Sequence, residues 1–453
     1  MAHEHGLDTH ATHGHANVHG AALHIDHGPR VLPRDLSAPP IVTAWRTRSL
    51  MVGVAGLVLS LIFLVVPQGI DHLARATVLS FFLVFSLVGG GLCVLMLQYV
   101  SGGKWGLVIR RPLEAMTRTQ PLAWVLFAAI MLFGRKLFLW MEFPNRDSVE
   151  NALANHLVTE GQAHALNWKH IMLSPMSVTV QFIIIFAFTG IFAGFLNKWS
   201  LDRDADPAAG TQRSFEYWRI KSENLSGIGI LLYSFVITIV AIDLIMSMDI
   251  TWFSTMWGLQ FLVGQGYIVL AVAIHSIVRL SRTQPIATAL RVTEQHDLGK
   301  FLFAFVMLNI YLTFAQFLII WSANTPEEIE FFLHRIRGGW WVICSLDFIF
   351  HWVIPFTLLL SRGFKRSRSK MLALTSFMVF ARAFDLYWLI EPNFPLSMNH
   401  FAGGGISMLA YVTLPVGVMG IWTWYYLTQL SQRPLIVLND PHTAEILEPE
   451  HAH

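Results

Sequence analysis

Ten runs of apolar residues, each long enough to cross a lipid bilayer as a helix, constrain this chain more than any other feature. A spanning helix needs about 20 mostly apolar residues. The runs cover approximately residues 49–66, 77–100, 122–141, 176–196, 228–248, 256–280, 300–321, 340–361, 371–390 and 407–430. Charged residues make up only 13% of the chain, against about a quarter in a soluble domain. We therefore predict an all-α integral membrane protein with ten transmembrane helices.

The polar ends and the positive charges divide the chain and orient it. We predict a His-rich, disordered tail over residues 1–44, a ten-helix transmembrane domain over 45–430 and a C-terminal tail over 431–453. The two tails and the loops on their side of the membrane hold 23 Lys and Arg residues, whereas the opposite loops hold 5. Because cytoplasmic loops carry the excess of positive residues, both termini are expected in the cytoplasm.

The histidines and cysteines do not form a recognisable cofactor motif. The N-terminal tail holds eight histidines, and such a tract can bind transition metals. Because nothing in it fixes a coordination geometry, the simpler interpretation is a disordered tail that binds metal weakly. Cys93 and Cys344 lie inside apolar runs, and no CxxC pattern provides for a covalent haem or an iron–sulfur cluster. The start of the chain lacks the apolar core of a signal peptide, so no cleaved leader is expected. We expect this chain to hold no redox centre, and its net charge of +2 gives no indication of nucleic acid as a partner.

The third and seventh apolar runs end in a similar way. Each gives a Trp, then a Pro four or five residues later, then acidic residues, in LFLWMEFPNRDSVE and FLIIWSANTPEEIE. This weak internal repeat favours two four-helix bundles, formed by segments 2–5 and 6–9 and flanked by segments 1 and 10.

Several ionisable residues lie within or at the ends of apolar runs, where they are costly and by default indicate function. They are Arg135, Asp243, Asp249, Asp347, His351, Arg382 and Asp385. With the orientation above, nearly all fall in the half of the membrane opposite the termini, which suits a proton path that opens on that side. Asp347 and His351 are spaced to share one face of a helix. Arg382 is expected to pair with Asp385 or Asp243, and structural ion pairing is the alternative interpretation.

An aromatic group beside Asp249 is the sequence's candidate for a quinone site. Such a site needs an apolar slot with an aromatic wall and one or two convergent polar groups. Trp252, Phe253 and Trp257 offer that combination at the membrane face. The alternative is that they belong to the belt of aromatic residues found at membrane interfaces.

Four blocks of the sequence resemble one family. They are QFLIIWSANTPEEIEFFLHRIRGGWW (Gln316–Trp341), SMDITWFSTMWG (Ser247–Gly258), GGWWVICSLDFIFHWVIPFTLLLSR (Gly338–Arg362) and RPLIVLND (Arg433–Asp440). In these blocks the chain resembles the ActF-type polytopic membrane subunit of alternative complex III, a bacterial quinol:cytochrome c oxidoreductase, within the wider NrfD-like family. The paired prolines expected after the WFSTMWG block in the sister subunit are absent here.

The resemblance implies a place in an assembly of the bacterial inner membrane. The implied partners are a multihaem cytochrome c, an iron–sulfur subunit with a molybdopterin-enzyme-like fold, a paralogous ten-helix subunit, smaller membrane and monohaem cytochrome subunits, and lipid. Haem c and iron–sulfur clusters would then belong to the partners. The role expected of this chain is a scaffold and a proton-conducting path, with quinone contact as a further hypothesis.

Two other classes of function stay open. A secondary transporter or ion-translocating protein also places charges at depth, but its helices are usually broken at corresponding positions in both halves. Pro355 and Pro415 do not correspond in that way. A pure assembly anchor would tolerate the loss of any buried charge that is not structurally paired.

Overall fold

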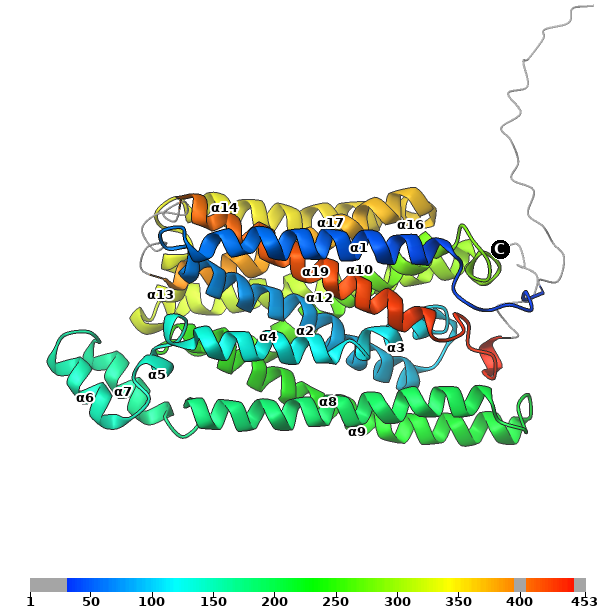
Figure 1. Cartoon of the computed structure of the whole chain (residues 1–453), viewed down its shortest axis with the longest axis horizontal. Coiled ribbons are helices and arrows are strands. Elements are labelled where there is room, and N and C mark those ends of the chain that lie inside the picture. Colours follow the sequence, from blue (N-terminus) through cyan, green and yellow to red (C-terminus); the bar gives the residue numbers. More distant parts are fainter. Residues whose placement is uncertain (1–30, 395–404, 444–453) are drawn as a thin grey trace, which may run out of the picture.

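The computed structural model describes residues 31–394 and 405–443, which form helices and no strands (Figure 1). Within this part of the chain, ten helical spans are long and apolar enough to cross a membrane. This confirms the predicted fold class, and the chain is a multi-pass membrane protein. Residues 1–30 and 444–453 lie outside the described residues, and with them most of the predicted His-rich tail and the end of the C-terminal tail.

Eight of the ten spans are built on single α-helices. They are α1 (Ile41–Ser60), α2 (Gly69–Ser101), α8 (Pro175–Asp204), α9 (Gln212–Leu244), α10 (Trp257–Leu280), α12 (Val292–Ala323), α17 (Arg368–Ile390) and α19 (Ala410–Ser431). The third span joins α3 (Arg110–Thr117) to α4 (Gln120–Phe133). The eighth joins α14 (Trp340–Asp347) to α15 (Ile354–Leu360) through a π-helical turn, Phe348–Val353.

In the described residues, six short α-helices lie outside the spans. They are α5 (Leu139–Glu142), α6 (Arg146–Ala154), α7 (Glu160–Lys169), α11 (Ile286–Ala289), α13 (Pro326–His334) and α16 (Arg362–Arg366). We call the end of the molecule where α1 begins and α19 finishes the terminal end. The opposite end, where α5, α6, α7 and α13 lie, is the far end (left in Figure 1).

Helices α2 and α10 form the centre of the fold. Both are apolar around their whole circumference and are largely buried, as expected of a helix surrounded by other helices. On α2, the three consecutive glycines Gly89, Gly90 and Gly91 face three different neighbours. A Cβ added to Gly90 would lie 2.7 Å from the Gln265 Cβ on α10. The absence of side chains therefore lets α2 pack closely against these neighbours.

The grouping of the helices agrees only in part with two separate bundles. Helix α2 packs against α4 and α9, and α10 packs against α12 and α17, as two groups would require. Helices α2 and α10 also pack against each other, and one continuous apolar core extends through both groups. The division into two four-helix bundles stays a prediction.

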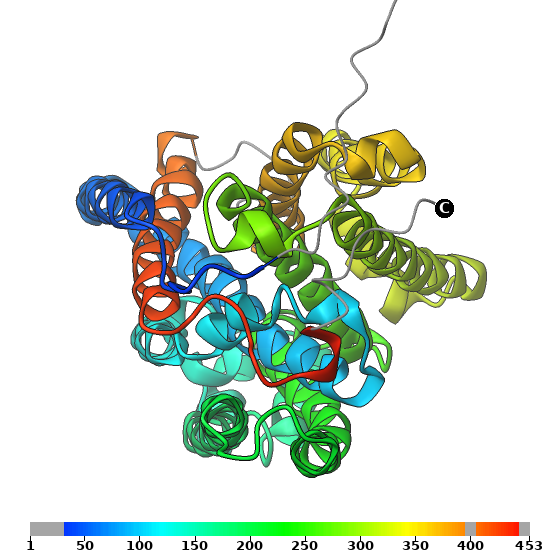
Figure 2. The same cartoon turned by 90° about the vertical axis from the view of Figure 1, so that its right-hand side faces the viewer.

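Helices α1 and α19 pack side by side at one edge of the molecule (Figure 2). Two pairs of glycines lie between them, Gly53 and Gly56 on α1 and Gly417 and Gly420 on α19. A Cβ added to Gly56 would lie 2.6 Å from the Gly417 backbone, so the two helices touch through their main chains. Close approach through small residues is typical of helix pairs in membranes.

Three details differ from the sequence predictions. Helix α1 begins at Ile41, so the last residues of the predicted tail are helical. The sequence from Ser214 to Gly227 is amphipathic, which indicates a separate piece at the membrane interface, but it forms the first part of the continuous helix α9, whose N-terminus the Thr211 side chain caps. The C-terminal tail folds back on the terminal end, where Leu435 and Val437 are buried.

Candidate functional site

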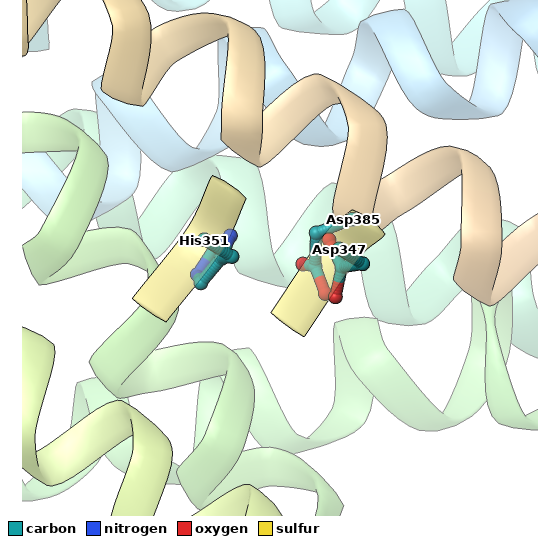
Figure 3. A group of neighbouring side chains, drawn as sticks. All are labelled: Asp347, His351 and Asp385. Atoms are coloured by element: carbon teal, nitrogen blue, oxygen red, sulfur yellow. The ribbon is translucent and has the colours of Figure 1, made fainter. Parts of the chain in front are cut away.

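Three ionisable side chains predicted from the sequence meet between α10, α17 and the π-helical turn. Asp347, His351 and Asp385 each offer a nitrogen or oxygen atom within 4.8 Å of the others, and all three are buried (Figure 3). We call these residues, with Arg382, the acid–histidine cluster. Their positions follow from helix geometry, because Asp347 and His351 lie one turn apart, as do Arg382 and Asp385.

His351 lies within the π-helical turn of the eighth span. This turn runs from Phe348 to Val353 and separates α14 from α15, with Pro355 following one residue after α15 begins. The Pro355 ring lacks an N–H, so a regular α-helix could not continue through it with all its hydrogen bonds. Single π-helical turns occur frequently at functional sites.

Tyr267 of α10 fixes the His351 ring. The two rings stack with centroids 4.4 Å apart and an interplanar angle of 11°. The Tyr267 hydroxyl donates a hydrogen bond to the His351 main-chain oxygen at 3.3 Å. This bond does not involve the imidazole ring, so Tyr267 occupies neither ring nitrogen of His351. Neither nitrogen, nor the Asp347 Oδ1 atom, has a hydrogen-bond partner among the described residues. These are the groups a proton carrier or a bound ligand would use.

Arg382 neutralises one of the two carboxylates. Its guanidinium forms an ion pair with Asp385, as the sequence analysis allowed. Gly264 of α10 makes room for it, because a Cβ there would lie 2.9 Å from the Arg382 Nη2 atom. The other pairing, Arg382 with Asp243, is not formed. Both Asp243 carboxyl oxygens are buried without a hydrogen-bond partner in the described part of the chain, so Asp243 is separate from the cluster.

A cavity with an aromatic wall adjoins the cluster on the side of the far end. Arg382 and Asp385 form part of its lining. The other lining residues include Trp257, Gln260, Phe261, Asn309, Thr313, Gln316, Phe331, Phe332 and Trp388. We call this space the aromatic cavity.

Some polar groups of the aromatic cavity are satisfied and others are open. Gln316 Oε1 accepts a hydrogen bond from the Ser254 hydroxyl at 2.8 Å, and Asn309 Oδ1 accepts one from the Trp352 indole at 2.9 Å. The indole nitrogens of Trp257 and Trp388 and the Gln260 side-chain oxygen have no partner among the described residues. Two donors and one acceptor of the lining residues are thus unpaired in the described part of the chain.

The quinone site proposed from the sequence is only partly assembled. Trp257 lines the aromatic cavity, and Trp252 stacks on Phe331 behind it with centroids 4.0 Å apart. Phe253, in contrast, is 58% exposed and points away. Asp249 lines a different hollow. The four residues therefore do not surround one ligand, because the chain between Asp249 and Trp257 turns at the helix ends.

That second hollow, which we call the far-end hollow, has an empty volume of about 1390 Å³. Asp249, Arg135, Glu142, Glu330 and His334 are among the residues that line it. Arg135 is the second-last residue of the third span, which ends at Lys136, and its side chain is exposed. It lines the same hollow as Asp249, and its part in a proton path stays a prediction.

Sequence reasoning missed Arg335, which lies between the aromatic cavity and the far-end hollow. Its guanidinium is buried, donates to the main-chain oxygens of Phe331 and Leu389 at 2.8 and 2.7 Å, and lies 3.4 Å from the Phe331 ring centroid. Burial lowers the pKa of Arg335 to about 9, although nearby Asp249 opposes the shift. Arg335 keeps its charge at neutral pH and fixes the Phe331 side of the cavity.

A second buried ionic group was also missed. Glu391 is fully buried and accepts hydrogen bonds from Arg75 at 2.7 Å and from the Tyr411 hydroxyl, and His72 Nε2 lies 3.4 Å away. The sequence signal was available, since Arg75 and Glu391 each lie within two residues of a predicted apolar run. Their pairing depends on contacts between α2, α17 and α19 that the sequence pattern does not give.

The chain matches no protein-family model, and a search of curated proteins finds no match either. The chemistry of the site is therefore inferred from its own geometry.

Proposed function

We propose that this chain is the membrane subunit of a quinol-oxidising complex of the alternative complex III type. In this proposal the aromatic cavity contacts the quinone and the acid–histidine cluster carries protons released from it. The observation that supports the proposal most is that the cavity and the cluster share two residues, Arg382 and Asp385. A quinone ring suits an aromatic slot with a few open polar groups, and its oxidation releases protons that need titratable groups within reach.

The proposed path runs from the acid–histidine cluster past the adjoining cavity to the far end. Asp347, His351 and Asp385 would pass protons inside the membrane, and the far-end hollow with Asp249, Glu330 and His334 would open to water. With the positive-residue asymmetry, the far end would face the periplasm, and both termini the cytoplasm of a bacterial inner membrane. Electrons would leave through haem c and iron–sulfur clusters of partner subunits, which the resemblance implies, together with a paralogous ten-helix subunit.

A cation-translocating protein is the second candidate, since two carboxylates and an imidazole within 4.8 Å of one another can bind a cation. The ion pair between Arg382 and Asp385 argues against it. That pair cancels one of the two negative charges and leaves the site little attraction for a metal ion. A proton, which binds to a single group, needs no such excess of negative charge.

One purification separates the two functions. The protein is extracted from its native membrane in mild detergent, its reduced-minus-oxidised visible spectrum is recorded, and the chains that co-purify are identified. The proposal predicts a c-type haem spectrum from partner subunits together with an iron–sulfur protein. A colourless protein isolated alone would contradict it and favour the transporter.

A further inference from the structure

Among the described residues, the terminal end contains a chain of seven largely buried charged side chains, four arginines and three carboxylates, so one positive charge is in excess within this chain. Arginine and carboxylate alternate in the order Arg110, Asp440, Arg203, Asp204, Arg111, Glu114 and Arg433. The Arg110–Asp440 contact is 2.8 Å, the Arg111–Glu114 contact is 2.7 Å, and the contacts of Arg203 with Asp440 and of Arg433 with Glu114 are 3.4 and 3.5 Å. No side chain of the seven is more than 16% exposed. An unbalanced buried charge is costly, so an anion would stabilise this network.

Arg203 is the incomplete member of the chain. Its Nη1 atom contacts the Asp440 carboxylate, which already accepts a shorter bond from Arg110. Its Nη2 atom is buried and has no hydrogen-bond partner among the described residues, and its Nε atom lies 3.7 Å from Asp204 Oδ1, too far for a hydrogen bond. Because a buried donor normally finds an acceptor, Arg203 has unused capacity for hydrogen bonds to an anion.

Arg203 lines a pocket with an empty volume of about 480 Å³ at the terminal end. Arg110 and Arg219 also line it, together with the aromatic side chains of Tyr99 and Trp218. We call it the terminal pocket. The loop between α8 and α9 holds it in shape, since Asp206 accepts hydrogen bonds from Ser214 at 2.6 Å and from the Trp218 indole at 2.8 Å.

The Asp440 carboxylate, which also lines the terminal pocket, repels an anion only weakly. Asp440 Oδ2 is shared by Arg110 and Arg203, and Oδ1 accepts a hydrogen bond from the His442 main-chain nitrogen at 3.1 Å. Burial raises the pKa of Asp440, but Arg110 and Arg203 outweigh this effect and hold it below its usual range. Asp440 is thus ionised and already neutralised.

We propose that the terminal pocket binds the phosphate group of an anionic molecule through Arg203, with Arg219, which pairs with Glu223 at 2.7 Å, at the exposed edge of the pocket. A guanidinium donates two parallel hydrogen bonds to phosphate, and one negative charge would balance the network. The pocket lies where spanning helices end beside interfacial tryptophan, a position at which basic pockets hold lipid headgroups. The phosphate could belong to an anionic phospholipid or to a small soluble phosphate. The proposal does not depend on quinol oxidation, because the pocket and the acid–histidine cluster lie in different parts of the molecule.

The test measures lipid retention on the protein purified from its native membrane, in whatever complex it forms. After delipidation, phosphatidylglycerol or phosphatidylcholine is added at equal concentrations, and bound lipid is counted by native mass spectrometry. The variants are Arg203→Gln, which removes the open donors, and Arg219→Gln, which changes an exposed residue at the pocket and is not expected to affect folding. Arg213→Gln is the matched control, because Arg213 is an exposed arginine on α9 that does not line the pocket.

We expect Arg203→Gln to weaken binding of phosphatidylglycerol by about ten- to a hundredfold, the loss typical of a charge-assisted hydrogen bond. Arg219→Gln should weaken it less, and Arg213→Gln and phosphatidylcholine should show no specific effect. A parallel arm measures thermal stabilisation by inorganic phosphate against chloride at equal ionic strength. If inorganic phosphate stabilises the native protein but not Arg203→Gln, and phosphatidylglycerol binds no better than phosphatidylcholine, the pocket binds a soluble phosphate. If neither probe distinguishes the native protein from both pocket variants, the proposal is wrong.

Discussion

Arg382 and Asp385 illustrate how a charge is kept inside a membrane at the scale of single residues. Each side chain is almost fully buried, and each is tolerated because the other neutralises it. Removing one partner of a buried pair leaves an uncompensated charge, whereas replacing both with apolar residues is often nearly neutral. The pair can therefore be tested for a structural role independently of proton transfer.

We expect Arg382→Leu to destabilise the protein by about 3–5 kcal/mol, because Asp385 is then buried without its partner. The double variant Arg382→Leu/Asp385→Leu should recover most of that loss. Thermal unfolding in detergent, followed by tryptophan fluorescence, measures both. A single variant as stable as Arg213→Gln, an exposed control, would show that the pair does not stabilise the fold.

The sequence identifies buried ionisable residues deep in apolar runs, but not those near the ends of the runs. Asp347, His351 and Asp385 could be identified because an ionisable group in the middle of an apolar run has no ordinary explanation. Arg335 and Glu391 looked like loop residues, since their burial depends on neighbouring helices. Of the aromatic residues that line the aromatic cavity, Trp257 was part of the predicted quinone site, and the rest of the lining was not predictable because the wall combines α10, α12, α13 and α17.

At the scale of elements, α1 and α19 are held by backbone contact at four glycines. Any side chain at these positions must push the two helices apart. We expect Gly56→Ala to destabilise the protein by about 1–3 kcal/mol through overpacking. Gly194→Ala in α8 is the control, because a Cβ there meets nothing within 4 Å and alanine favours the helix. Unfolding in detergent compares them, and equal stability of the two variants would disprove the close packing.

At the scale of the whole molecule, the ten spans were predictable because length and apolar composition define them. Each predicted run falls largely within one observed span. Which helices pack together was less predictable, since α2 and α10 are apolar on every side and their sequences do not favour one neighbour. The C-terminal tail was predicted as a separate polar segment, yet Asp440 joins it to α3 and α8.

The link through Asp440 predicts a pH dependence of stability. Its pKa is lower in the folded protein than in the unfolded chain, so its stabilising contribution is complete above the unfolded value and is lost as the pH falls through the folded one. We expect the native protein to lose stability below about pH 5, and Asp440→Asn to be less stable near neutral pH but to lose less on acidification. Thermal unfolding across this range tests it, and parallel curves for the two proteins would contradict it.

The central claim is that the acid–histidine cluster carries protons for the reaction at the adjoining cavity. The most direct measurement is the rate of quinol oxidation by the intact complex carrying Asp347→Asn, compared with Asp243→Asn, which changes a buried carboxyl outside the cluster. We predict that Asp347→Asn lowers turnover by at least about tenfold, because asparagine cannot take up and release a proton, while Asp243→Asn stays near the native rate. Native turnover of an assembled Asp347→Asn complex would contradict the account and leave the cluster a structural role only.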